Sequence, residues 1–153
     1  MINKKNWIKL TIMLLVTIAT SILLISFSVI DTQKILCQKS DFQYNAISLS
    51  AIIGGFLFTG ISILISAIDK ERIKRLWENK YLDNLYRCSF VGMISNVITI
   101  VAAFILLCCR INTMFQEVMI YIEVTTLIIG IVFFSWSIKQ LMFILTRMKN
   151  DRN

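Results

Sequence analysis

Histidine and proline are both absent from this sequence of 153 residues. Without histidine, the chain lacks the commonest general base of enzymes and the commonest metal ligand. Proline and glycine usually mark the broken helices with which transporters expose backbone groups near the middle of the membrane. Because only 5 glycines are available for that purpose, we expect unbroken helices.

Recognisable catalytic patterns are missing as well. The sequence contains no phosphate-binding glycine loop, no zinc motif and no set of residues from which a Ser-His-Asp triad can be assembled. An intramembrane hydrolase would lack its base. We therefore expect a protein that is not an enzyme and that uses neither a metal nor a cofactor.

Charge is also scarce. Charged residues make up 16% of the chain, against about 25% in soluble domains, and hydrophobic residues make up 57%, against about 45–50%. A soluble domain of this length cannot bury so much apolar surface, whereas lipid accepts it. The sequence therefore predicts one membrane domain that covers residues 1–153, with membrane lipid as its first partner.

Four apolar segments reach the length of about 20 residues that a helix needs to cross the hydrocarbon core. They predict an all-α, polytopic fold with spans at about 7–30, 46–68, 88–109 and 118–138. The first is longer than the apolar region of a signal peptide and lacks a small-residue cleavage site, so we expect it to be retained. The fourth has the least certain ends, because apolar residues resume after Lys139 and Gln140.

Lysine and arginine are distributed unequally between the two sides of these spans. Thirteen of the 16 lie in the N-terminal segment, in the segment 69–87 or after the fourth span. The positive-inside rule places that side, and with it both termini, in the cytoplasm. The basic excess then indicates attraction to anionic lipid and no direct nucleic-acid binding. High Ile, Lys and Asn usage suggests a bacterial source, and hence the bacterial inner membrane.

The segment 69–87 is the only sizeable predicted part outside the membrane. Its apolar side chains recur at helical spacing and its opposite charges lie four residues apart, which predicts a short cytoplasmic helical hairpin. One interpretation is a solvated hairpin on the lipid headgroups. The other is a docking surface for a cytoplasmic protein, because large aromatic side chains contribute much of the energy of protein interfaces. Its predicted contact residues are Ile73, Trp77, Tyr81 and Leu85.

Small residues recur along the second span, several of them four residues apart. Ser50, Gly54, Gly55 and Gly60 would let helix backbones approach closely, and Asn96 in the third span can hydrogen-bond between helices. These residues predict either a packing face, within one chain or between copies of a homo-oligomer, or the lining of a pore.

Glu123 is the one charged residue inside the fourth predicted span. A carboxyl group in the hydrocarbon is costly and is therefore a functional hypothesis by default. At 1.5 Å per residue it would lie about 8 Å below the outer end of the span. There it would bind an ion or substrate, reach the interface, or pair with Arg110.

Three cysteines are predicted on the outer side of the membrane, where disulfides persist. Cys37 would bond to Cys108 or Cys109, or all three would remain free thiols. A redox enzyme is disfavoured, since the four-helix disulfide oxidoreductases use Cys-x-x-Cys pairs and these cysteines do not form one.

The segments GGFLFTGIS, at 54–62, and YLDNLYR, at 81–87, resemble small bacterial membrane proteins of antiphage defence operons, in particular the membrane subunits of Kiwa systems. The resemblance covers about residues 46–110. It implies four helices with a glycine-rich second helix and a charged helical inner loop. It also implies a soluble cytoplasmic partner that carries the recognition or effector activity. It assigns no functional residue.

Three functions follow as expectations. The first is a scaffold or sensor subunit that self-associates and docks a cytoplasmic partner, in the setting of antiphage defence. The second is a pore-like effector lined by residues such as Ser50, Thr59, Ser62, Asn96 or Glu123. The third is an immunity protein that shields the membrane from a bacteriocin or toxin.

Overall fold

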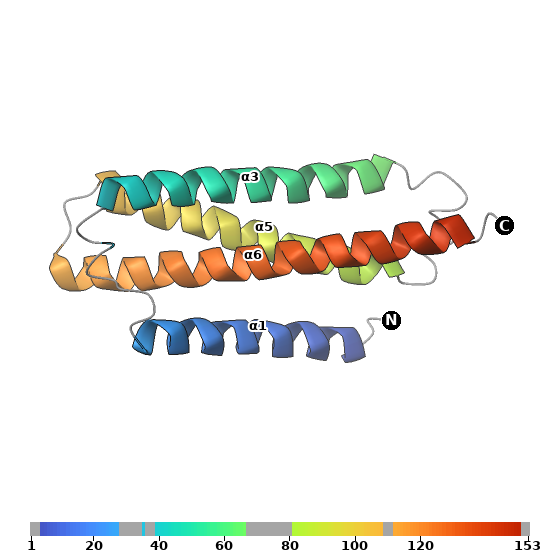
Figure 1. Cartoon of the computed structure of the whole chain (residues 1–153), viewed down its shortest axis with the longest axis horizontal. Coiled ribbons are helices and arrows are strands. Elements are labelled where there is room, and N and C mark those ends of the chain that lie inside the picture. Colours follow the sequence, from blue (N-terminus) through green and yellow to red (C-terminus); the bar gives the residue numbers. More distant parts are fainter. Residues whose placement is uncertain (1–3, 28–34, 36–38, 67–80, 109–111, 151–153) are drawn as a thin grey trace.

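The computed structural model describes residues 4–27, 35, 39–66, 81–108 and 112–150. These residues form four helices, which are α1 (Lys4–Ser26), α3 (Lys39–Ser66), α5 (Tyr81–Cys108) and α6 (Thr113–Asn150). Successive helices run in opposite directions, so both ends of the chain lie at the same end of the bundle (Figure 1). The all-α fold class is therefore confirmed.

Helices α3, α5 and α6 form the centre of the bundle. Helix α5 packs along both α3 and α6, while α1 packs mainly against α6 (Figure 1). Helix α1 is thus the least embedded of the four, and most of the protein interior lies where α3, α5 and α6 meet.

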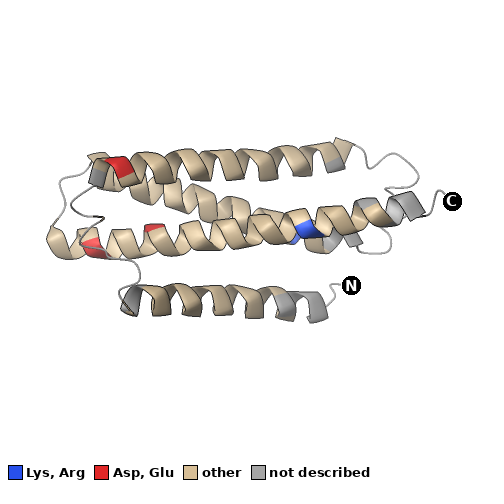
Figure 2. Ribbon diagram, in the orientation of Figure 1, with Lys and Arg blue, Asp and Glu red and all other residues tan. Residues whose placement is uncertain are grey.

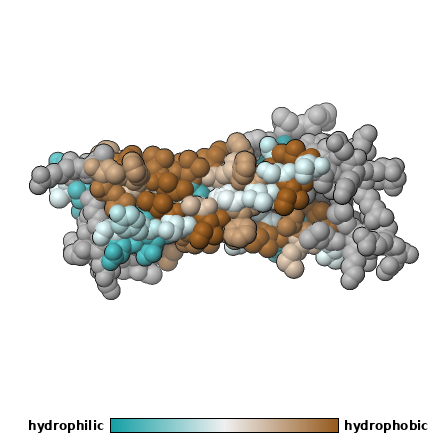
Figure 3. Space-filling model, turned by 90° about the horizontal axis from the view of Figure 1, so that it is seen from above, coloured by the Kyte–Doolittle hydropathy of each residue, from teal (hydrophilic) through white to brown (hydrophobic). Residues whose placement is uncertain are grey.

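Three of the helices contain apolar stretches long enough to cross a membrane. These stretches are Ser40–Ile63, Asn84–Cys108 and Thr113–Ile144. Helix α1 contains a shorter one, Leu10–Leu24. Apolar side chains also dominate the middle of the surface in Figure 3, so the described chain has the character of a helical membrane protein.

The predicted spans are found as helices, but their ends differ. Helix α3 begins at Lys39, well before the predicted start at Ala46, and Asp41 in its first turn suits the positive end of the helix dipole. Helix α6 continues past the predicted end at Ile138 as one unbroken helix to Asn150. Helix α5 begins at Tyr81, so residues 81–87 are helical as predicted, whereas 69–80 lie outside the described residues.

The interior contains two apolar clusters. One joins α1, α5 and α6 and consists of Leu10, Cys88, Ile129 and Phe133. The other lies toward the opposite end of the bundle and consists of Leu106, Ile120 and Val124, with Ile35 and Phe42 packed against it. Polar side chains are buried beside both clusters, and these form the candidate site.

Candidate functional site in the polar core

The buried face of α3 repeats at alternating intervals of three and four residues. Its members are Gln43, Ala46, Ser50, Ile53 and Leu57. This spacing is that of a helix seam packed against its neighbours. Because Gln43 belongs to the seam, α3 carries a polar amide into the protein interior.

Gln43 meets Glu123 of α6 inside the bundle. Both side chains are 0% exposed, and Gln43 Nε2 donates a hydrogen bond to Glu123 Oε2 over 3.4 Å. That distance exceeds the usual range for an N–H···O bond, so the bond is weak. Glu123 Oε1 and Gln43 Oε1 have no hydrogen-bond partner. The Glu123 carboxyl is therefore buried rather than at the interface, and Arg110, its other predicted partner, lies outside the described residues.

Hydroxyl groups continue the polar interior one turn further along α6. The Oγ1 atoms of Thr126 and Thr99 lie 2.9 Å apart, which links α6 to α5. Thr126 Oγ1 also donates to the backbone oxygens of Ile122 and Glu123. The carboxyl layer and the threonine layer are thus neighbours on one buried face.

Asn96 occupies a space made by two glycines. Its Nδ2 donates to the Gly92 backbone oxygen over 2.7 Å, and its Oδ1 is buried without a partner. A Cβ atom at Gly130 would lie 2.8–3.0 Å from the Asn96 amide group, whereas one at Gly54 would lie 3.7 Å from Asn96 Cβ. Gly130 therefore allows α6 to pass over Asn96, and Gly54 of α3 faces the same side chain.

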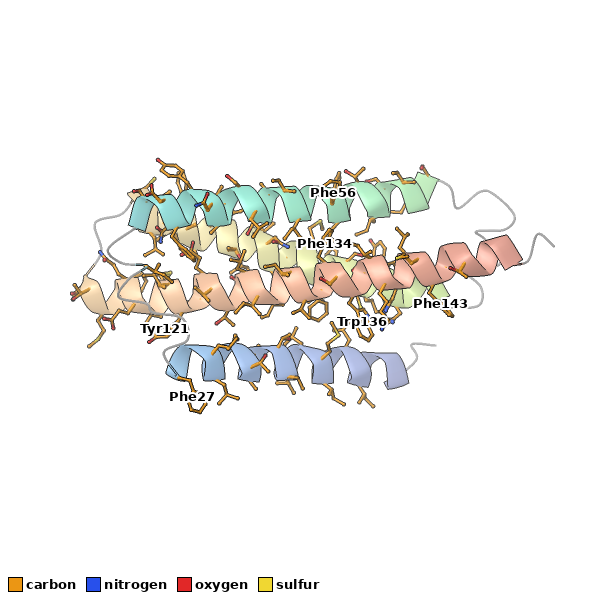
Figure 4. All side chains as sticks on the ribbon, in the orientation of Figure 1. Phe27, Phe56, Tyr121, Phe134, Trp136 and Phe143 are labelled. Carbon is orange, nitrogen blue, oxygen red and sulfur yellow. The ribbon has the colours of Figure 1, made fainter. Side chains whose placement is uncertain are left out.

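A serine pair marks the other end of the polar core. Ser89 Oγ donates to Ser137 Oγ over 3.1 Å, and both side chains are buried. The two serines border a small apolar pocket between α3, α5 and α6 to which Gly60, Leu85 and Phe134 also contribute. Figure 4 shows Phe134 on the side of α6 that faces α3. From Glu123 to Ser137 the polar core extends about 21 Å along α6.

The small residues of α3 divide between two faces. Ser50 is buried and Gly54 contacts Asn96, so these two belong to the interior. Ala51 and Gly55 lie on the exposed side, and a Cβ atom at Gly55 would meet nothing within 4 Å. The sequence predicted one packing face, whereas the small residues of α3 lie partly on a buried face and partly on an exposed one.

The residues predicted to line a pore do not converge. Ser50, Asn96 and Glu123 are buried among the helices. Thr59 and Ser62 are exposed on α3 and donate to backbone oxygens of their own helix, at Gly55 and Phe58.

The predicted docking residues are only partly described. Leu85 is 3% exposed and borders the pocket, so it offers no surface to a partner. Tyr81 is the first residue of α5. Ile73 and Trp77 lie outside the described residues.

The cysteines are described in part as well. Cys108 is a free, exposed thiol at the end of α5, and Cys88 is free and buried. Cys37 and Cys109, the other members of the predicted outer disulfide, lie outside the described residues.

Sequence reasoning identified Glu123, Asn96, Ser50 and Gly54 but missed Gln43. The predicted span began at Ala46, so Gln43 was assigned to a loop. The signal was present, since the seam spacing of Ala46, Ser50 and Ile53 extends back to Gln43 without interruption. Gly130 was missed too, because its role depends on which residue of α5 it faces.

The chemistry available in this core is hydrogen bonding and proton exchange. Among the described residues no group of three or more His, Cys, Asp or Glu side chains is placed to hold a metal ion. Comparison with protein-family models, with curated proteins and with solved structures finds no match for the chain. The polar core and the surfaces of the helices are therefore the features of this protein that bear on its function.

Proposed function

We propose that this protein is a non-enzymatic subunit of the bacterial inner membrane that crosses the bilayer four times and self-associates through the outer face of α3. The observation that carries the proposal is an uninterrupted stripe of small residues on the exposed side of α3. Its members recur every three or four residues and are Ser48, Ala51, Gly55, Thr59, Ser62 and Ser66.

This outer stripe suits a helix partner in lipid. Helices associate in membranes mainly where small side chains let their backbones come close. The hydroxyl groups of Thr59, Ser62 and Ser66 already bond to backbone oxygens of α3, so three of the polar side chains in the stripe are satisfied within their own helix. Exposed large side chains such as Phe56 and Ile63 also lie on the outside of α3, and they would pack against a second copy of α3 whose backbone approaches the stripe.

A fourth span by α1 is supported by its length and direction. Its 23 residues correspond to about 35 Å of helix, of which the apolar stretch Leu10–Leu24 covers about 22 Å, so the residues that flank this stretch would have to complete a crossing of about 30 Å. It lies beside α6 with its N-terminus at the end of the bundle that also holds the C-terminus (Figure 1).

The described charges support an orientation with both termini in the cytoplasm. Figure 2 shows acidic residues toward the end of the bundle remote from the termini, and basic residues nearer the other end. Glu117 and Lys139 are separated by about 33 Å along α6, which matches the hydrocarbon thickness. The Lys139 ammonium lies 5.7 Å from the Trp136 ring, the type of residue that gathers at membrane interfaces.

The scaffold role and the cytoplasmic partner extend this proposal. Helix α6 reaches Asn150, beyond the apolar stretch that ends at Ile144, and so provides helical surface on the cytoplasmic side. Docking of a partner at Ile73, Trp77 and Tyr81, and a place in antiphage defence, stay predictions from the sequence. The pore and immunity functions stay predictions as well.

Self-association is tested with Gly55→Leu. Because nothing within 4 Å surrounds a Cβ atom at this position, the larger side chain leaves the fold of one chain intact but closes the outer stripe. We expect wild-type protein in lipid nanodiscs to be oligomeric by single-molecule photobleaching, and Gly55→Leu to shift the population toward monomers.

The matched control is Ala19→Leu, which adds bulk at an exposed position of α1. It should keep the wild-type distribution of oligomers. A monomeric wild-type protein would contradict the proposal, and so would a Gly55→Leu variant with an unchanged distribution.

A further inference from the structure

The pairing of Gln43 with Glu123 leaves buried oxygen atoms without hydrogen-bond partners, and the proposed self-association does not explain them. Four buried oxygen atoms lack a hydrogen-bond partner, namely Gln43 Oε1, Ser50 Oγ, Asn96 Oδ1 and Glu123 Oε1. All of them can accept a hydrogen bond. The amide oxygens of Gln43 and Asn96 can only accept, the Ser50 hydroxyl can also donate, and the Glu123 carboxyl can donate once it is protonated. Between Gln43 and Glu123 the two unpaired atoms are both oxygens, so a hydrogen bond between them requires a proton on the carboxyl group.

We propose that Gln43 and Glu123 form a proton-binding site, in which Glu123 is a neutral carboxylic acid whose O–H donates to the side-chain oxygen of Gln43. The oxygen and nitrogen ends of an amide have nearly the same shape, so Gln43 can present either end to the carboxyl group. The added proton turns a weak contact of 3.4 Å into a bond between a strong donor and a previously unpaired acceptor.

Burial supports the neutral form. An isolated carboxylate moved from water into an apolar interior is so unfavourable that the group takes up a proton instead. The surroundings of Glu123 are apolar, because Leu106, Ile120 and Val124 form a cluster at this level of the bundle. Within the described residues no ion pair to Glu123 is present to offset a negative charge.

Most of the described ionisable groups on the neighbouring helices are exposed, whereas Arg87 is partly buried and Cys88 is buried. Arg87 lies near the start of α5, where the adjacent Ser89 pairs with Ser137 of α6, and Lys139 is about 24 Å from Glu123 along α6, so both are remote from the carboxyl group. The described side chains of α1 include no ionisable group. Those nearer to Glu123 along the bundle are Asp41 and Tyr44 on α3, Cys108 on α5, and Glu117 and Tyr121 on α6.

A proton fits this site better than a metal ion does. Hard cations such as Ca²⁺ take six to eight oxygen ligands, whereas the side chains of Gln43 and Glu123 supply two unpaired oxygens at this level. A proton needs one donor–acceptor pair and no cavity. The proton-binding site therefore joins α3 to α6. Loss of the proton would leave a negative charge on Glu123 beneath the apolar cluster.

Infrared spectroscopy of the full-length protein in lipid tests the proposal directly. At neutral pH the wild type should show the C=O stretch of a protonated carboxylic acid, and Glu123→Gln should lose that band. The control Glu117→Gln changes an exposed carboxyl of the same helix and should keep it. Gln43→Leu should keep the band but shift its frequency, because the acceptor is gone. A wild-type spectrum without the band at neutral pH would overturn the proposal.

Chemical labelling provides a second test on the unmodified protein. Dicyclohexylcarbodiimide partitions into membranes and reacts with protonated carboxyl groups, and mass spectrometry locates the adduct. Labelling of Glu123 should fall about tenfold per pH unit once the site titrates. Labelling that is independent of pH would contradict a proton site. Protection by sodium ions at constant pH would assign the site to sodium and would equally overturn the proposal.

Discussion

Among single residues, Asn96 and Gly130 show how closely the helices of this bundle fit together. The amide of Asn96 is fixed by its bond to the Gly92 backbone oxygen and fills the space that a side chain at position 130 would occupy. A polar side chain in the interior of a membrane protein therefore sets where α6 can pass over α5. The glycine is required by its neighbour in space rather than by its own backbone conformation.

Gly130→Ala should destabilise the protein by roughly 1–2 kcal/mol. Overpacking a close contact costs about 1–3 kcal/mol, and the higher helix propensity of alanine offsets up to about 1 kcal/mol. Gly55→Ala is the matched control within an exposed helix position and should be neutral or slightly stabilising. Thermal unfolding of both variants in the same detergent gives the comparison.

The double variant Gly130→Ala with Asn96→Ala should recover part of the loss, because the contact that Gly130→Ala strains is then absent. Such recovery is the expected result for two residues in contact. If the two losses simply add, the clash between these positions is not the cause.

Much of the polar core could be predicted from residue type alone. Glu123 and Asn96 stand out because polar groups are rare and expensive in hydrocarbon. Gln43 does not stand out, since glutamine near the end of an apolar segment is ordinary. Only the helical seam that continues back from Ala46 reveals that it is buried. Gly130 could not be assigned from sequence, because its neighbour Asn96 is 34 positions away and on another helix.

At the scale of the helices, α1 differs from the other three. It contacts the bundle mainly through α6, and Leu10 belongs to the apolar cluster with Phe133 of α6. Phe133 is fully buried and also contacts the position of Gly92 on α5. The Phe133 side chain therefore helps to hold α1, α5 and α6 together.

Phe133→Ala should destabilise the bundle by up to about 3 kcal/mol and loosen α1. This is the lower end of the range for buried Phe→Ala changes in water-soluble proteins, since lipid is as apolar as the interior and only packing is lost. The control Phe104→Ala removes a ring that is 60% exposed and should have little effect. Unfolding midpoints measure stability, and distances between spin labels on α1 and α6 measure the loosening.

An unfolding midpoint equal in both variants would show that the Phe133 side chain does not hold α1.

The existence of the four helices was predictable because apolar length alone determines it. Their ends were not, since polar residues such as Asp41 and Gln43 at a helix start are equally compatible with a loop. The sequence also left open whether α6 continues beyond Lys139, because polar residues at this point are equally compatible with the end of a helix.

For the whole molecule, the proposed orientation determines which thiol meets the outside. Cys108 is exposed at the end of the bundle remote from the termini, and Cys88 is buried toward the other end. In a variant with Cys37→Ser and Cys109→Ser, a membrane-impermeant maleimide should label Cys108 in intact cells. The label should disappear when Cys108→Ser is added.

Labelling of Cys108 only in inverted membrane vesicles would reverse the proposed orientation. Labelling from neither side would place the end of α5 within the membrane. The orientation itself rests on the distribution of Lys and Arg, which the sequence alone supplies and which the positions of Lys139 and Glu117 along α6 support.

The separation of acidic and basic side chains along the bundle has an electrical consequence. In the proposed orientation Asp41 and Glu117 would lie near the outer surface and Arg87 and Lys139 near the inner one, and these charges would form a dipole aligned with the field of a membrane whose interior is negative. Moving one elementary charge through such a field changes the free energy by about 2.3 kcal/mol per 100 mV. The resting voltage would therefore oppose any motion that carries Lys139 outward. A displacement of α6 that moves this charge through the membrane would be measurable as a gating current.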